Sequence, residues 1–186
     1  MRKLATLSAL VFVALSSSVV LGSADASRTV ELKGTEHFVP NALINADFRF
    51  SPGPLSVKSG DMVTWQNTIM APDPHTISIV NASDLPTNVN QVFNCGAPGT
   101  VCAAILACHF PNGFGPGGPN PPINLACGNA ANGNFAAVGD SFLIPPPGFG
   151  PASLQTVSAK ITAPSGSVLH YLCAIHPWMQ GEINVS

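Results

Sequence analysis

The stretch Tyr171-Leu-Cys-Ala-Ile-His-Pro-Trp-Met-Gln-Gly181 carries a thiol, an imidazole and a thioether at intervals of three residues. It joins two short runs, 168–173 and 181–185, that have the composition of β-strands. A loop between two strands can wrap around one point and direct all three side chains toward it. The spacing therefore predicts a metal site built from this loop.

The combination of donor atoms indicates which metal is bound. Two imidazoles and a thiolate in a trigonal arrangement, with a weak axial thioether, are typical of blue-copper sites, so a second histidine is needed. His75 is the best candidate, because it begins an alternating strand whose apolar face also carries Ile77 and Ile79. The predicted ligands of one type-1 copper ion are His75, Cys173, His176 and Met179.

Three of these four residues have an alternative interpretation. His37 is the fallback for the second histidine, and the amide oxygen of Gln180 could replace the thioether as axial ligand. Cys173 could be a buried free thiol, Met179 a core side chain and His75 a core histidine that binds no metal.

Three segments together resemble the cupredoxin family, in its amicyanin- and plastocyanin-like form, and the Cys-x-x-His-Pro-x-Met spacing is similar to that of amicyanin in particular. They are Gly60-Asp-Met-Val-Thr-Trp-Gln-Asn67, Pro74-His75 and the C-terminal stretch 171–181. The resemblance covers roughly residues 28–82 and 153–186. It implies an eight-stranded Greek-key β-sandwich with copper at one end, held by the same four side chains.

The resemblance also implies how the protein meets its partners. Cupredoxins usually present the edge of the C-terminal histidine ligand through an apolar patch, so redox partner proteins are expected to dock transiently near His176. The residues expected to form the patch are Met70, Pro72, Pro74, Pro177 and Trp178.

Composition gives the same fold class without the resemblance. The chain contains 17 glycines and 18 prolines without a Gly-X-Y period, and its apolar residues cluster in short runs rather than helical stripes. This predicts one all-β domain over residues 27–186. The turn Ser59-Gly-Asp61 between two alternating runs, 55–58 and 62–66, predicts a β-hairpin there.

A segment rich in proline, glycine and asparagine, at about 84–151, interrupts this pattern and contains no convincing regular element. We refer to it as the insertion. Four of the five cysteines lie within it, so it is predicted to be a loop held by disulfides, with Cys173 unpaired. Three pairings are possible, and proximity in sequence favours Cys95 with Cys102 and Cys108 with Cys127.

The N-terminus predicts export. Residues 1–26 combine two basic residues, an apolar run and an Ala-x-Ala site, which are the features of a signal peptide cleaved near Ala26. The mature chain is then expected to be soluble in the periplasm or outside the cell, with no membrane span. Charged residues make up only 9% of the chain and its formal net charge is −2, which argues against a nucleic-acid partner.

These features together predict a monomeric, soluble carrier of single electrons and not an enzyme. Copper enzymes need additional metal centres, whereas the chain has five histidines and no His-x-His pair. Of the remaining histidines, His170 is expected on the surface and His109 to be structural or exposed. The alternative function is a protein that stores, delivers or senses copper without electron transport.

Overall fold

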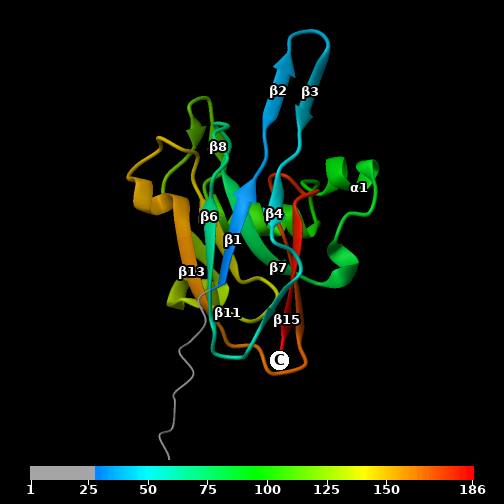
Figure 1. Cartoon of the computed structure of the whole chain (residues 1–186). Coiled ribbons are helices and arrows are strands. Elements are labelled where there is room, and N and C mark those ends of the chain that lie inside the picture. The colour runs from blue at the N-terminus through cyan, green and yellow to red at the C-terminus, as the bar shows by residue number, and fades with distance from the viewer. Residues whose placement is uncertain (1–27) are drawn as a thin grey trace, which may run out of the picture.

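The computed structural model describes residues 28–186, which form two β-sheets packed against each other (Figure 1). The first sheet has the order β11-β13-β6-β1-β4, with bounds Asn134–Phe135, Thr156–Ile161, Met62–Asn67, Arg28–Lys33 and Arg49–Ser51. The second has the order β10-β12-β7-β14-β15-β5, with bounds Ala126–Cys127, Ser141–Ile144, His75–Val80, Val168–Leu172, Gln180–Val185 and Leu55–Val57. The predicted β-sandwich is confirmed. The predicted leader, residues 1–26, lies outside the described residues.

The chain crosses repeatedly from one sheet to the other, so that neighbouring strands are often distant in sequence, as in a Greek key. In the second sheet β7 lies between β12 and β14, antiparallel to both. In the first, β6 pairs with β1 in parallel and with β13 antiparallel. This topology brings the start of β7 beside the loop that follows β14.

The hairpin predicted around residues 59–61 is wrong, although the turn itself exists. The Asp61 carboxylate accepts a hydrogen bond from the backbone N–H of Lys58 at 2.9 Å, but β5 then pairs with β15 in the second sheet and β6 joins the first. Both strands place alternate apolar side chains in the same core. Alternation alone does not distinguish two strands that pair from two strands that face each other across a sandwich.

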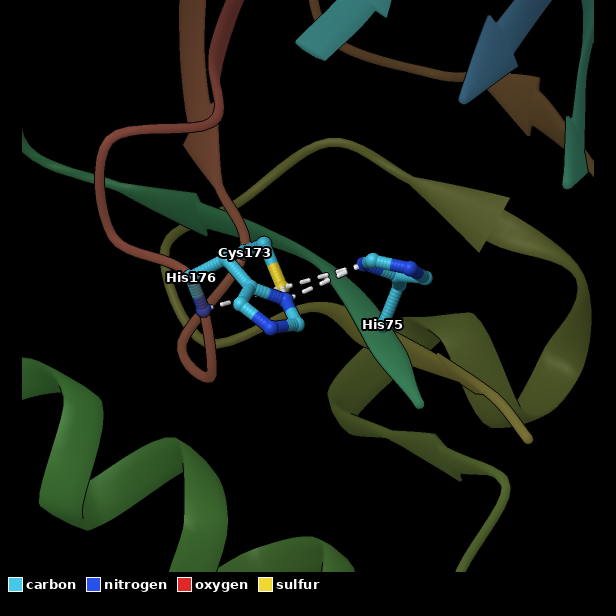
Figure 2. Close-up of side chains that lie close together, drawn as sticks. All are labelled: His75, Cys173 and His176. Carbon is cyan, nitrogen blue, oxygen red and sulfur yellow. Dashed lines mark hydrogen bonds between the residues drawn. The ribbon is translucent and has the colours of Figure 1, made fainter. Parts of the chain in front are cut away.

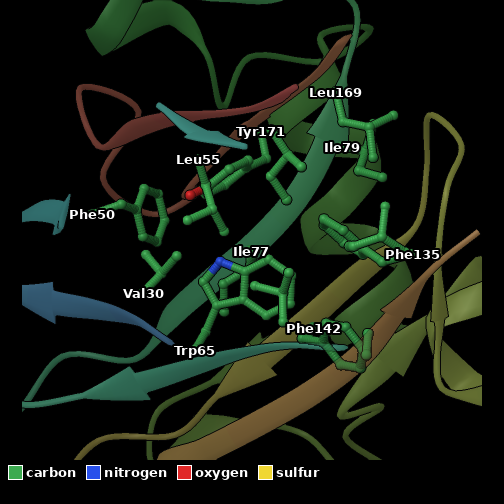
Figure 3. Close-up of a cluster of buried hydrophobic side chains, with 14 of the residues drawn as sticks. Val30, Phe50, Leu55, Trp65, Ile77, Ile79, Phe135, Phe142, Leu169 and Tyr171 are labelled. Carbon is green, nitrogen blue, oxygen red and sulfur yellow. The ribbon is translucent and has the colours of Figure 1, made fainter. Parts of the chain in front are cut away.

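Side chains from both sheets interdigitate in one core (Figure 3). Trp65, from β6, is fully buried, and its ring lies 5.0 Å from that of Phe135 and 6.1 Å from that of Tyr171, measured between centroids. The alternation predicted for this strand is confirmed, since Val63 and Trp65 are both buried while Gln66 is exposed.

The insertion is more regular than predicted. It contains the helices α1 (Val89–Asn94) and α2 (Val101–His109), the short strands β8 (Phe114–Gly115) and β9 (Gly118–Pro119), the strands β10 to β12, and a 3-10 turn at Gly128–Asn132. Two further 3-10 turns, Ala82–Asp84 and Ala152–Gln155, flank it. Side chains of Asn88 and Thr100 cap the two α-helices. The four apolar or small residues of β12 complete the second sheet. These short elements were not predicted, because the glycines and prolines around them dominate the sequence pattern.

Both disulfides favoured by sequence proximity are present. They join Cys95 to Cys102 and Cys108 to Cys127, with Cα atoms 5.2 and 6.4 Å apart, and Cys173 is free and buried. The bridge between Cys95 and Cys102 belongs to a small apolar cluster that also contains Val80 and Leu172. The insertion therefore packs against the outer face of the second sheet.

A hairpin of β2 (Glu36–Val39) and β3 (Leu43–Ala46) projects from the end of the sandwich opposite the C-terminus (Figure 1). Within residues 28–186, no helix has both the length and the apolar character required to cross a membrane.

The contact between Gly181 and Tyr171 gives a test of the fold. These residues pair across β14 and β15, and a Cβ atom added at Gly181 would overlap the buried ring of Tyr171. We expect Gly181→Ala to lower the free energy of unfolding by about 1–3 kcal/mol, because the ring has no free space to enter. Urea denaturation measures the change. Gly117→Ala is the control, since a Cβ there has no neighbour within 4 Å, and an equal loss in both variants would contradict the packing described.

Candidate metal centre

Two distant segments bring three potential ligands together at one end of the sandwich. His75 is the first residue of β7, while Cys173 and His176 lie in the loop between β14 and β15. Figure 2 shows their side chains converging on one point. The Nδ1 atoms of the two histidines are 3.2 Å apart, and the sulfur of Cys173 lies 3.9 Å from the Nδ1 of His75 and 3.7 Å from that of His176.

These separations suit a small cation. Bonds of about 2.0 Å to nitrogen and 2.3 Å to sulfur, in trigonal or tetrahedral geometry, place the donor atoms roughly 3.3–3.8 Å apart. Two buried imidazole nitrogens and a thiol sulfur face one another here. Protons alone cannot pair all of their lone pairs. A cation at their centre would satisfy all three lone pairs. The residues present therefore fit a bound metal ion.

Met179 is placed by the same loop. Its side chain is fully buried, its backbone N–H donates to the carbonyl of His176 at 2.8 Å, and its carbonyl accepts from the N–H of Cys173 at 3.0 Å. The two bonds close residues 173–179 into a compact turn. Gln180, the alternative axial residue, instead donates its side-chain amide to the carbonyls of Pro86 and Pro177.

Backbone groups hold the sulfur of Cys173. The N–H of Thr76 donates to it at 3.3 Å and that of His176 at 3.4 Å. The Thr76 hydroxyl accepts from the N–H of Ala174 at 2.7 Å. This bond joins β7 to the loop 173–179 between β14 and β15, which we call the ligand loop. The sulfur of Cys173 and the start of the loop that carries His176 are thus held by hydrogen bonds that do not depend on a metal.

Burial controls the protonation of the three groups. Desolvation, followed by the charge of His176, lowers the pKa of His75 to about 3. Desolvation also lowers the pKa of His176, although the carboxylate of Asp73, 3.9 Å from its Nε2, acts in the opposite sense. Burial raises the pKa of Cys173, opposed by hydrogen bonds from Thr76 and from backbone groups of its own loop. Both imidazoles are therefore available as neutral ligands at neutral pH.

Aromatic rings surround the two histidines. The ring of Phe48 meets those of His75 and His176 edge-on, with centroids 5.4 and 5.0 Å away, and Trp178 packs against His176 at 5.2 Å. Phe48 is 2% exposed and excludes water from the inner side of the site. Phe48 is a residue of the site that sequence reasoning missed, because nothing in its local pattern indicates partners so distant in sequence.

The remaining histidines lie elsewhere. His37, the fallback ligand, is exposed on the hairpin of β2 and β3, and His170 is half-buried with its Nδ1 3.6 Å from the Glu182 carboxylate. His109 is completely buried and hydrogen-bonded inside the insertion, so its interpretation as a structural residue is confirmed.

No family model matches the sequence, and no curated protein matches it significantly. Among solved structures, the chain is similar to reduced auracyanin from Roseiflexus castenholzii, with 16% identity, 89% of this chain and 99% of that chain covered, and a TM-score of 0.42. Auracyanin A, a "blue" copper protein from Chloroflexus aurantiacus, has 17% identity, with 87% of this chain and 98% of that chain covered and a TM-score of 0.42. A purple cupredoxin from Nitrosopumilus maritimus has 17% identity, with 86% of this chain and 99% of that chain covered and a TM-score of 0.36.

These structures include the family that the sequence motifs resemble. At such low identities and TM-scores, the likeness transfers no function to the present chain.

The low pKa of His75 predicts how the metal-free protein responds to acid. As the pH falls below 6.5, His75 binds a proton in the unfolded chain. In the folded chain it stays neutral until about pH 3. The free energy of unfolding should therefore decrease as the pH is lowered from 6.5 to about 3, by about 1.4 kcal/mol per pH unit for this group. Denaturant titrations of wild type and His75→Gln measure the effect together with its coupling to His176, whose charge also lowers the pKa of His75. Identical pH profiles would contradict the burial of a neutral imidazole.

Proposed function

We propose that the protein binds one type-1 copper ion through His75, Cys173, His176 and Met179 and transfers single electrons. The observation that carries this proposal is the buried convergence of two imidazole Nδ1 atoms and one thiol sulfur, all within 4.8 Å of one another, beside a buried methionine. Thiolate and thioether favour Cu(I), while imidazole accepts both oxidation states.

When bound, copper would supply the one-electron couple. The chain's own contribution is to hold the ligands in one arrangement and keep water away. His75, Cys173 and Met179 are fully buried and His176 is 8% exposed. Hydrogen bonds from β7 and within the loop fix the ligands, so little rearrangement is needed when the charge of the site changes. This rigidity favours electron transfer over release of the metal to a recipient protein.

His176 gives the site its route to the surface. Its ring reaches the surface between Asp73 and Trp178, beside an apolar groove of about 940 Å³. Four of the five residues expected to form the docking patch line the groove, and Met70 lies exposed nearby. The insertion supplies much of the remaining wall, including Phe93, Phe110, Phe114 and Phe149.

None of the described residues that line this groove is charged. A redox partner that presents an uncharged apolar surface would fit it, and contact of this kind suits brief docking. In this proposal the mature chain, residues 27–186, is a monomeric carrier rather than a catalyst. The predicted leader and the two disulfides support its export to an oxidising compartment.

Reconstitution with Cu(II) tests the metal site. We expect one copper per chain and an intense blue absorption that bleaches on reduction, because the thiolate of Cys173 would be a direct ligand. Metal analysis and visible and EPR spectra provide the measurement. Cys173→Ser should lose the absorption, whereas Cys102→Ser with Cys95→Ser, which leaves the candidate ligands intact, should retain it.

A wild-type protein that binds no copper would overturn the proposal. Rapid loss of copper to a chelator together with slow electron self-exchange would instead favour storage or delivery of the metal. Self-exchange is measured from NMR line broadening in mixtures of the Cu(I) and Cu(II) forms.

The same measurement tests the docking groove. We expect Phe93→Ser with Phe149→Ser to slow self-exchange about fivefold or more, because truncating an apolar contact residue costs about 1 kcal/mol of association free energy. Phe38→Ser is the control: Phe38 is 62% exposed, but it lies on the β2–β3 hairpin outside the groove. A rate that is unchanged in the double variant, or equally slow in the control, would exclude the groove as the contact surface.

A further inference from the structure

A continuous line of buried hydrogen-bonding groups runs from the insertion to the ligand loop. The Nε2 of His109 lies 2.7 Å from the hydroxyl of Ser141, which lies 2.6 Å from that of Ser78. Ser78 is in turn 3.1 Å from the hydroxyl of Thr76. Thr76 accepts from Ala174 and donates its backbone N–H to the sulfur of Cys173. We call this line the hydroxyl chain.

The placement of these residues follows from strand geometry. His75, Ile77 and Ile79 face the sandwich core, so Thr76 and Ser78 face the opposite side of β7, under the insertion. Ser141 pairs with Ser78 across β12 and β7. His109, the last residue of α2, reaches the same layer from above.

Burial makes this arrangement costly unless every group is satisfied. His109, Thr76 and Ser78 are 0% exposed and Ser141 is 1% exposed. An unpaired buried hydroxyl costs about 1–3 kcal/mol, so apolar residues would give a simpler contact between the insertion and the sheet. A fully connected polar line in this position calls for a role beyond packing.

The protonation state of His109 determines the direction in which hydrogen bonds are donated along the hydroxyl chain. A carbonyl only accepts, so the Nδ1 of His109, 2.6 Å from the carbonyl of Asn124, carries a proton. In the neutral ring Nε2 then accepts from Ser141 and Ser141 accepts from Ser78, so the single proton of Ser78 is not available to Thr76. In the charged ring Nε2 donates, and each hydroxyl donates toward Thr76 instead.

The second direction favours donation to sulfur. Ser78 has good geometry to donate to Thr76. Once Thr76 accepts from Ser78 and Ala174, its own proton is free to turn toward Cys173, and its hydroxyl is among the groups that oppose the effect of burial on the pKa of the thiol. Added donation weakens the thiolate as a ligand, which favours Cu(I) over Cu(II) and raises the reduction potential.

We propose that His109 is a positioning residue for Cys173: through Ser141, Ser78 and Thr76, the charge on its ring sets hydrogen bonding at the sulfur and therefore the reduction potential. The inference rests on the proposed copper site and assigns a role to the insertion. The disulfide between Cys108 and Cys127 helps to hold the ring, since the sulfur of Cys127 lies 3.6 Å from its Nδ1.

Few charges act on His109 directly. Residues 101–127, which include α2 and β10, contain no Asp, Glu, Lys or Arg, and the two cysteines beside the ring are disulfide-bonded. On the side of the sheet the His109 ring contacts the hydroxyl of Ser141, on β12. Asp140, next to Ser141, turns its carboxylate to the backbone N–H groups of Asn129, Ala136 and Ala137. Burial lowers the pKa of His109, opposed by its bond to the Asn124 carbonyl, so the change of direction should occur on the acid side of its ordinary range.

The test is the reduction potential of the copper-loaded protein as a function of pH. We expect the wild-type potential to rise as His109 gains its proton, with the protonation followed independently by NMR of the ring. His109→Gln can still donate to Asn124 and accept from Ser141 but does not titrate, so it should keep the neutral-pH potential and lose the rise. His37→Gln, which removes an exposed histidine, should keep both.

Ser141→Ala separates the hydroxyl chain from a simple effect of charge through space. It leaves His109 in place and interrupts the line, so most of the rise should disappear even though the ring still titrates. A full rise in Ser141→Ala, or in His109→Gln, would overturn the inference. So would nitrogen chemical shifts showing that neutral His109 in the metal-free protein carries its proton on Nε2.

The two proposals fail in different ways. If the wild type takes up no copper and shows no blue absorption, the copper site itself is wrong, and the inference falls with it. If copper binds with the expected spectrum but the pH dependence is the same in wild type and Ser141→Ala, only the role of His109 is wrong.

Discussion

The hydrogen bonds between β7 and the ligand loop are the constraint on which the site depends. Thr76 donates its N–H to the sulfur of Cys173 and accepts the N–H of Ala174 through its hydroxyl. These two bonds join residues almost one hundred positions apart and orient His75 toward the loop. They form only because β7 and β14 are adjacent strands, so the Greek-key topology, rather than any local motif, assembles the three donors.

The sequence was sufficient to predict which three donor side chains the fold brings together. Cys173 and His176 follow the strand β14 at a spacing that a single turn can close, and His75 begins a strand whose alternation places it on the core side. Phe48 and Asp73 could not be recognised in the same way, because their importance arises from the packing of distant segments. The pairing of β5 with β15 escaped prediction for the same reason.

The insertion shows a different limit of sequence analysis. Its helices and the strand β12 are short, and their signals are diluted by glycine and proline, although the cysteine pairing could be predicted from spacing. What could not be predicted is that these elements cover the outer face of β7. Because that face is covered, Thr76 and Ser78 are buried, and a strand that would otherwise meet water is enclosed on both sides.

Enclosure on both sides changes what polar residues on β7 can do. A hydroxyl at a wet surface exchanges its partners with water, whereas a hydroxyl in a dry layer must choose between fixed donors and acceptors. The choice made at one end of such a line constrains every member up to the other end. His109 is the one residue of the line whose number of protons changes with pH, so it alone can reverse the line. A sheet covered by a disulfide-bound insertion thus has the means to connect its outer surface to the sulfur at its edge.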